Sequence, residues 1–207
     1  MSPLLIFPFG ANSIEALDCI DPKQYQLLGF VDDDASKIGT EYCGIKIFGR
    51  KAFEHFNHAK VLACIGSFKN YREKGAIIES LGIEKNRFVN IIHHTAQISP
   101  FATLGTNCLV MAGVVLTHNA KIGDNAIILP NSVIHHDVEI GNNVFVGSGT
   151  IICGGVKVAD NCFIGAGSRL INHISIGKNT LIGLGSNVIA SVSEGKKVAG
   201  NPAREFY

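Results

Sequence analysis

The second half of the chain places an aliphatic residue at every sixth position. From Ile98 to Val188, sixteen consecutive positions spaced by six are Ile, Leu or Val, and the residue two positions earlier is always small or β-branched. A helix repeats near 3.6 residues and a strand near two, so neither explains a period of six. A coil with three short flat faces does explain it. The pattern therefore predicts a parallel β-helix of about five stacked coils between residues 93 and 190.

Glycine directly follows the aliphatic residue at seven of these steps, from Gly105 to Gly183. We expect these glycines to supply backbone conformations that a side chain would forbid at the corners of the coil. The small residues two positions before each aliphatic are expected to fit the same tight corners.

The first ninety residues lack the repeat and alternate between strand and helix patterns. They predict strands at 3–9, 26–31, 44–49 and 61–65, and helices at 14–20 and 71–81. This alternation is typical of a small parallel α/β sheet of the Rossmann-like kind. We therefore divide the chain into an α/β domain at residues 1–92 and an all-β helix domain at 93–207, whose last residues form a capping loop.

Ligands of parallel α/β sheets bind beyond the carboxyl ends of the strands. That rule points to Gly10, Ala11, Asn12 and Ser13 after the first strand, and to Asp32 and Asp33 after the second. The loop at Gly10 lacks the glycine pattern of dinucleotide sites. The aspartates can equally belong to a solvated turn.

The charge and the cysteine content of the chain argue against a nucleic-acid-binding protein and against a disulfide-bonded one. The 207 residues carry 18 basic and 17 acidic side chains without a basic cluster, which argues against a nucleic-acid partner. The apolar start of the chain is short, broken by proline and without basic residues, so we expect neither a signal peptide nor a membrane span. The six cysteines form no C-x-x-C pair. We expect them to be reduced, mostly buried thiols of a cytoplasmic protein.

Histidine is the side chain best suited to act as a general base near neutral pH. In the segment IHHDVEIG at residues 134–141, Val138 and Ile140 take the small and inward positions of the repeat. His136 and Asp137 then lie near a corner and project outward. His135 is the alternative base.

A spacing of eighteen residues, three hexads, places side chains above one another in consecutive coils. His118, His136 and Gly154 have this spacing and should stack on one corner, about 4.8 Å apart. Ala166 and Leu184 form a second column, twelve residues out of phase and therefore on another corner. His118 is either a second functional histidine or a stacked polar residue.

Together these motifs resemble the hexapeptide-repeat sugar acetyltransferases of the sialic-acid O-acetyltransferase and bacillosamine N-acetyltransferase group. The resemblance rests on the Gly-Ala loop after the first strand, GFVDDD at 29–34, GIKIFG at 44–49, Ile65-Gly66 with Arg72, and HTAQISP at 94–100. It implies a left-handed β-helix, acetyl-CoA as co-substrate, and a homotrimer with active sites between subunits.

The resemblance also implies roles for individual residues. His136 would be the general base, Asp137 would orient it, and the backbone N–H of Gly154 would stabilise the oxyanion. The Gly10–Ser13 loop would lie near the phosphates of a nucleotide-linked sugar, with Asp32 and Asp33 near its base. In the closing loop, Lys197 would lie near the phosphates of coenzyme A, with Lys196 and Arg204 as its neighbours. Alternatively, this loop only caps the last coil. The chain departs from the group at Leu129 and Phe145, where members commonly carry Asn and His.

The sequence therefore predicts an acetyl-CoA-dependent N-acetyltransferase acting on a nucleotide-linked amino sugar in surface-glycan biosynthesis. One alternative is O-acetylation of a sugar of the sialic-acid type. A second is a non-catalytic β-helix assembly module, which would need the hexads but not His136, Asp137 and Gly154. We expect no metal, because the His-x4-His pair of zinc-dependent hexapeptide enzymes is missing from the coils.

Overall fold

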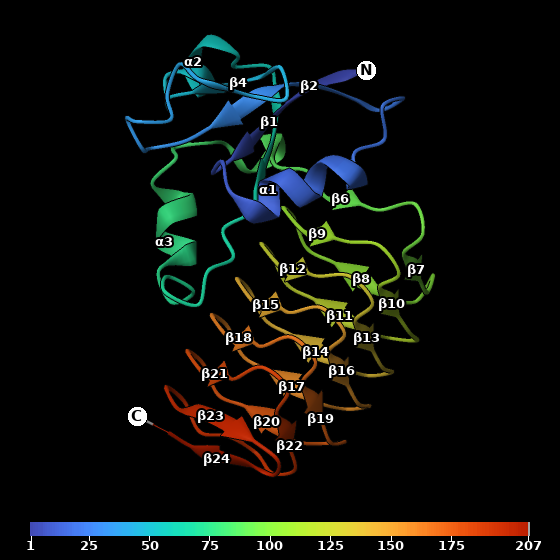
Figure 1. Ribbon diagram of the computed structural model, residues 1–207. Coiled ribbons are helices and arrows are strands. Elements are labelled where there is room, and N and C mark those ends of the chain that lie inside the picture. Colours follow the sequence, from blue (N-terminus) through green and yellow to red (C-terminus); the bar gives the residue numbers. More distant parts are fainter. Residues whose placement is uncertain (207) are drawn as a thin grey trace.

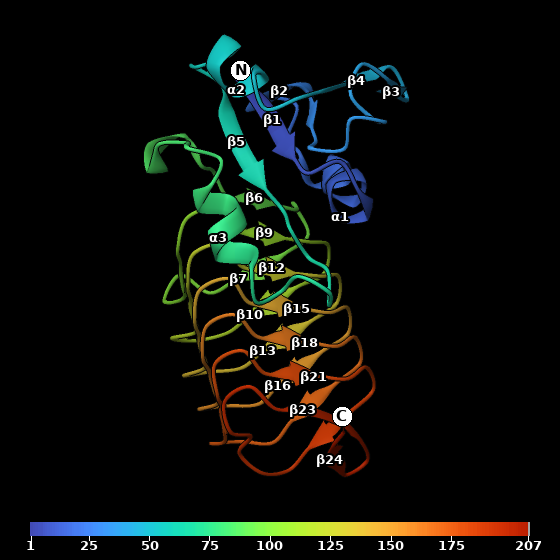
Figure 2. The ribbon, with the colours of Figure 1, turned by 90° about the vertical axis from the view of Figure 1, so that its left-hand side faces the viewer.

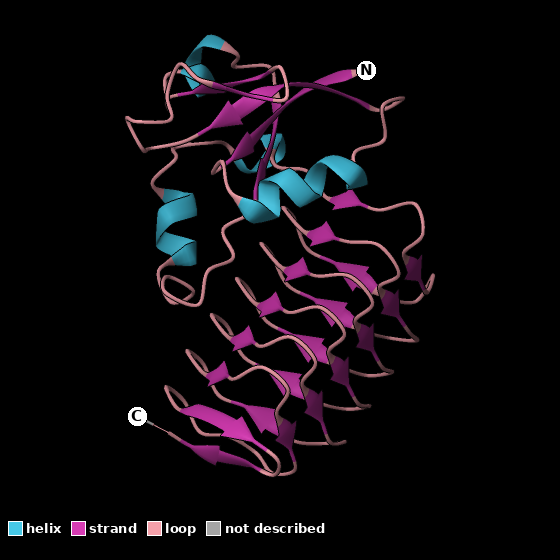
Figure 3. Cartoon of the chain, viewed as in Figure 1, coloured by secondary structure: helices cyan, strands magenta, loops and turns pink. Residues whose placement is uncertain are grey.

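The computed structural model describes residues 1–206, in which a small sheet and its short helices sit on one end of a long β-helix (Figure 1). The described helices are three α-helices and two 3-10 helices. All helices belong to the sheet unit, and the coils consist only of short strands and loops (Figure 3). Within the described residues, no helix has the length and apolar character needed to cross a membrane.

The N-terminal sheet has five strands in the order β3-β4-β2-β1-β5. They are β1 (Ser2–Phe7), β2 (Tyr25–Val31), β3 (Glu41–Tyr42), β4 (Ile45–Phe48) and β5 (Lys60–Ala63). The pairs β1–β2, β1–β5 and β2–β4 are parallel, whereas β3 and β4 form an antiparallel hairpin. Four of these strands were predicted, and the two-residue β3 was not.

Side chains of β1 alternate between two buried clusters, as period-two packing requires. Leu5 and Phe7 pack on the side of α2 (Ala52–His55) and α3 (Lys74–Glu79). Leu4 and Ile6 face the opposite side, which holds the short helices α1 (Ala11–Glu15) and η1 (Ala16–Cys19). This second cluster also contains Leu109, Ile127 and Phe145 of the β-helix, so the sheet unit and the coils share a core.

The predicted parallel β-helix is confirmed. Its three faces are sheets of short strands, each paired with the strand eighteen residues away, as in Val115↔Val133, Lys121↔Glu139 and Ile127↔Phe145. The first face contains β6 (Ile91–Ile92), β9 (Leu109–Val110), β12 (Ile127–Ile128), β15 (Phe145–Val146), β18 (Phe163–Ile164), β21 (Leu181–Ile182), β23 (Lys197–Gly200) and the antiparallel β24 (Ala203–Glu205).

The other two faces contain the remaining strands. The second is made of β7 (Gln97–Ile98), β10 (Val115–Leu116), β13 (Val133–Ile134), β16 (Ile151–Ile152), β19 (Arg169–Leu170) and β22 (Asn187–Val188). The third is made of β8 (Thr103–Leu104), β11 (Lys121–Ile122), β14 (Glu139–Ile140), β17 (Lys157–Val158) and β20 (Ser175–Ile176). The aliphatic residue of the repeat points inward in every coil and forms one continuous core.

The corners are built differently from the sequence-based expectation. The left-handed backbone conformation recurs every sixth residue from Asn107 to Gly185, and asparagine or glycine fills most of these positions. The glycines that follow the aliphatic residues have no positive φ. They are needed because a Cβ at Gly105 or Gly141 would collide with the backbone of the next coil. Asparagine supplies the turn, since its side chain tolerates this conformation.

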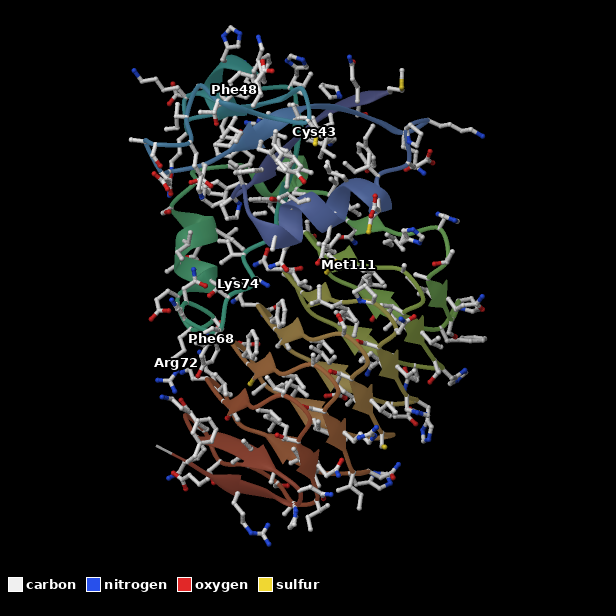
Figure 4. The ribbon with its side chains drawn as sticks, viewed as in Figure 1. Cys43, Phe48, Phe68, Arg72, Lys74 and Met111 are labelled. Atoms are coloured by element: carbon white, nitrogen blue, oxygen red, sulfur yellow. The ribbon has the colours of Figure 1, made fainter. Side chains whose placement is uncertain are left out.

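Helix α3 lies along the flank of the coils (Figure 2). It is shorter than the predicted helix at 71–81, because the preceding residues contact the β-helix: Tyr71 Oη donates to the carbonyl of Asn179 at 3.1 Å, and Arg72 donates to the carbonyl of Gly195 at 3.0 Å. Figure 4 shows Arg72 and Phe68 in the loop before α3, beside the lower coils. The remaining short helix, η2 (Lys85–Arg87), leads into β6.

Candidate active site

His136 and Asp137 project from the corner between β13 and β14 and form a hydrogen-bonded pair. His136 Nδ1 lies 2.9 Å from Asp137 Oδ2, and each side chain is more than half exposed. An ionised carboxylate can only accept a hydrogen bond, so Nδ1 carries the proton of the neutral ring. Nε2 is then unprotonated and available to accept a proton.

Asp137 is itself held in place by Asn119, one coil earlier. Asn119 Nδ2 donates to Asp137 Oδ1 at 2.7 Å, so the two oxygens of the carboxylate are bonded to Asn119 and His136. These bonds, the one from Asn119 first, lower the pKa of Asp137 below its ordinary value. The carboxylate therefore stays ionised and keeps the imidazole in one orientation and tautomer.

The column of residues spaced by eighteen is present at this corner. The N–H of Asp137 donates to the carbonyl of His118, and the N–H of Gly155 donates to the carbonyl of His136 at 3.0 Å. The ring of His136 lies directly over Gly154, where a Cβ would come within 2.5 Å of Nε2. Only glycine leaves room for the imidazole here. One coil earlier, the ring of His118 packs against that of Phe101, with 4.6 Å between the ring centroids.

The second column lies on a different corner, between the first and second faces. Ala166 follows β18 and Leu184 follows β21, and the N–H of Gly185 donates to the carbonyl of Ala166 at 2.7 Å. Leu184 is 81% exposed. Lys197 begins β23 at the C-terminal end and is also exposed. The structure thus separates these three residues from the His136 corner within one chain.

The loop after β1 lines a pocket of about 250 Å³ together with the end of β5. Its walls are Gly10–Ser13 on one side and Cys64–Ser67 with Asn70 on the other. Ser13 closes the loop, because its Oγ accepts from the N–H of Gly10 at 2.8 Å and donates to the carbonyl of Gly10. Gly66 lies against Asn12 and the ring of Phe145, so the pocket borders the first face of the β-helix.

Asp32 and Asp33 do not line this pocket and are both engaged elsewhere. Asp32 is buried and pairs with Lys37 Nζ at 3.1 Å, and Lys37 also contacts the carbonyl of Phe9 beside the loop. Asp33 forms two bonds with Arg50, at 2.6 and 2.7 Å, which lower the pKa of its carboxyl group. The structure therefore brings Gly10–Ser13 together as one wall of the pocket. Asp32 and Asp33 instead form ion pairs with Lys37 and Arg50.

Asn119 is the functional candidate that the sequence reasoning missed. Its signal was available, because it stands eighteen residues before Asp137 and therefore directly above it in the stack. Within residues 1–206, no group of three or more His, Cys, Asp or Glu side chains is arranged to hold a metal ion.

Comparison with protein families places the repeat among known transferases. The bacterial transferase hexapeptide model (six repeats) matches residues 119–154 and 140–172. The hexapeptide repeat of succinyl-transferase matches residues 102–118 and 173–198. A search of curated proteins finds no match to the chain.

Several solved structures match nearly the whole chain, including the following three. A variant of GDP-perosamine N-acetyl transferase from Caulobacter crescentus, in complex with CoA and GDP-perosamine, has 25% identity and a TM-score of 0.87, and the match covers 100% of this chain and 97% of that one. The acetyltransferase domain of PglB from Neisseria gonorrhoeae, in complex with acetyl coenzyme A, has 23% identity, a TM-score of 0.85 and coverages of 99% and 98%. WeeI from Acinetobacter baumannii has 23% identity, a TM-score of 0.84 and covers both chains fully, at 100% and 100%.

Proposed function

We propose that this chain, a hexapeptide-repeat acetyltransferase, transfers an acetyl group from acetyl-CoA to the amino group of a nucleotide-linked sugar, in the biosynthesis of a surface glycan. The observation that supports this most is the match to the GDP-perosamine enzyme over the whole chain, sheet unit included. A β-helix serving only as a scaffold would not need the His136–Asp137 pair or the glycine beneath it.

In the proposed reaction His136 is the general base. Its Nε2 accepts a proton from the acceptor amine as the nitrogen attacks the carbonyl carbon of the thioester. The C–S bond then breaks, its electron pair stays on sulfur, and the thiolate takes up the proton from His136. Asp137 favours the first of these proton transfers, because an adjacent carboxylate stabilises the imidazolium that forms.

Gly154 would stabilise the negative charge that develops on the thioester oxygen. Gly154 lies beside the His136 ring at the same corner. A preorganised N–H donor aimed at the developing oxyanion lowers the barrier, because the site does not have to rearrange during the reaction. Ala166, Leu184 and Lys197 would contact the arm and phosphates of coenzyme A along the later coils.

The acceptor would bind to the sheet unit. In this proposal residues 1–92 form a Rossmann-like nucleotide-sugar domain, with Gly10–Ser13 near the phosphates and the Asp32–Asp33 turn near the base. Residues 93–207 form the left-handed catalytic domain. The pocket at Gly10 borders the first face of the coils, whereas His136 lies between the second and third. A homotrimer with sites between subunits is the assembly that would bring base and acceptor together.

The free thiols and the need for acetyl-CoA suit a cytoplasmic enzyme, and that location belongs to the same proposal.

The proposal is tested by replacing His136. We expect His136→Ala to lower kcat by about 10²- to 10⁴-fold, because a positioned general base contributes that much to proton transfer. His135→Ala is the matched control, since it removes the adjacent imidazole but leaves Asp137 and Gly154 in place. Circular dichroism and thermal melting would check that both variants are folded. A folded His136→Ala enzyme with the wild-type rate would remove His136 from the role of base.

A further inference from the structure

A second imidazole faces the glycine pair beneath His136, from the opposite side. His173 lies in the next coil, and its N–H donates to the carbonyl of Gly154 at 3.1 Å. A Cβ added to Gly155 would collide with His173 Nδ1, just as a Cβ on Gly154 would collide with His136 Nε2. The two rings therefore flank the Gly154–Gly155 peptide from the coils above and below it.

His173 also departs from the corner pattern. The left-handed corner position recurs every sixth residue between Asn107 and Gly185, and within that span every one is asparagine or glycine except two. The two exceptions are Asp137 and His173, both adjacent to the glycine pair, with φ of 58° and 61°. Histidine tolerates this conformation as asparagine and aspartate do, so the turn permits the imidazole without requiring it, and both departures from the pattern border the glycine pair.

The imidazole of His173 is free to contact a ligand. It is exposed, and within residues 1–206 its ring nitrogens form no hydrogen bond or ion pair with the protein. An imidazole always carries at least one N–H near neutral pH and can therefore donate to a carbonyl oxygen. His173 lies one coil beyond Gly154 in the C-terminal direction and on the same corner as His136, between β19 and β20.

We propose that His173 is a binding contact for acetyl-CoA, with an imidazole N–H donating to a carbonyl oxygen of the acyl-pantetheine arm where it passes the Gly154–Gly155 peptide. The inference rests on the proposed function, because that function runs the arm along these coils. His136 then acts on the acceptor side of the glycine pair and His173 on the donor side.

The test is the dissociation constant of acetyl-CoA, measured by calorimetry without any acceptor, for the wild type and for His173→Asn. Asparagine is the matched substitution because it occupies the same corner at Asn119 and the equivalent left-handed position of another corner at Asn143 and Asn161. We expect Kd and KM for acetyl-CoA to rise about tenfold, which corresponds to about 1.4 kcal/mol, with kcat changed by less than about twofold because a contact made equally in ground and transition states affects binding only. His58→Asn, an exposed site on the sheet unit, is the control and should bind normally.

The outcomes separate the two proposals. Equal acetyl-CoA affinity for wild type and His173→Asn would overturn the role of His173 and leave the proposed function standing. A wild type that binds no acetyl-CoA would overturn both. An equal loss of affinity for free CoA would support a contact with the pantetheine amides. A loss confined to acetyl-CoA, with a lower kcat, would place the contact on the thioester oxygen, whose negative charge grows in the transition state.

Discussion

At the scale of single residues, the proposed chemistry depends on how firmly Asp137 is held. We predict that Asn119→Gly lowers kcat/KM about tenfold, equivalent to about 1.4 kcal/mol, because Asp137 loses the 2.7 Å bond that fixes its second oxygen. Glycine retains the positive φ of this corner, so the backbone is not strained. Steady-state kinetics on the purified variant would measure the effect.

Asn179→Gly is the control for that experiment, since it makes the same change at a corner remote from His136. A loss of activity as large in Asn179→Gly would show that the effect comes from the stack as a whole and not from Asp137.

The six cysteines are expected to differ sharply in reactivity. Cys43 is exposed in the β3–β4 turn and labelled in Figure 4, and Cys153 is half-buried. Burial raises the pKa of Cys64 to about 12, and of Cys19, Cys108 and Cys162 to about 11. Only the thiolate reacts, so a disulfide reagent should modify Cys43 first, Cys153 more slowly, and the other four only after unfolding.

Cys43→Ser should abolish the fast phase of that titration, and fast labelling of more than two thiols in the native protein would contradict the described burial. The same variant would remove the background that Cys43 adds to assays of thiol release.

Much of the residue pattern was accessible from the sequence. The inward aliphatics and the corner location of His136 and Asp137 follow directly from the period of six. Asn119 and His173 belong to a neighbouring column, one residue later than the column of His136, to which the sequence pattern assigned no function. The ion pairs of Asp32 and Asp33 depend on Lys37 and Arg50, whose positions in space no local pattern encodes.

At the scale of elements, α3 carries a polar group at a cost to stability. Lys74, at the start of the helix, is 1% exposed, and its Nζ has no partner among the described residues. Figure 4 shows Lys74 on the side of α3 that faces the coils. Burial lowers the pKa of its ammonium group from 10.5 to about 7, against the opposing influence of Cys108 and Cys64.

We predict that Lys74→Met raises the melting temperature, because methionine fills a similar volume without a buried amine. The effect depends on pH. Between about pH 7 and 10.5 the unfolded chain binds a proton at this lysine that the folded chain does not, so wild-type stability should rise with pH across that window. Lys74→Met should lose this rise, as measured by thermal melting at several pH values.

Lys69→Met is the control, since Lys69 is exposed in the loop before the same helix. A lower melting temperature for Lys74→Met at pH 7 would mean that the ammonium group has a stabilising partner.

Among the elements, the strands and the inward-facing core of the β-helix could be predicted but not the construction of its corners, and the sheet unit could be predicted only in outline. The same residue pattern recurs in every coil and is therefore easy to recognise, whereas α2 and β3 are too short to have a periodic pattern. The prediction for the glycines that follow the aliphatic residues was wrong in one respect. Sequence shows that glycine recurs, but whether φ or the approach of another coil requires it is visible only in three dimensions.

At the scale of the whole molecule, the sheet unit is packed on the coils and not tethered to them. Asn107 in the β-helix both accepts from and donates to the backbone of Ala63 in β5, at 2.8 and 3.1 Å. Together with the shared core, this fixes the pocket at Gly10 relative to the first face. The position of this pocket is therefore a property of the assembled chain, which no single motif could reveal.

Acetyl transfer to a nucleotide-linked amino sugar can be measured on the purified protein. The wild type and His136→Ala would be incubated with acetyl-CoA and a panel of nucleotide-linked 4-amino sugars, including GDP-perosamine, beside plain sugars. Mass spectrometry would detect the acetylated product. We predict an N-acetylated nucleotide sugar from the wild type and very little from His136→Ala. The proposed function would be wrong if only plain sugars were acetylated, or if none of the amino sugars in the panel gave a product.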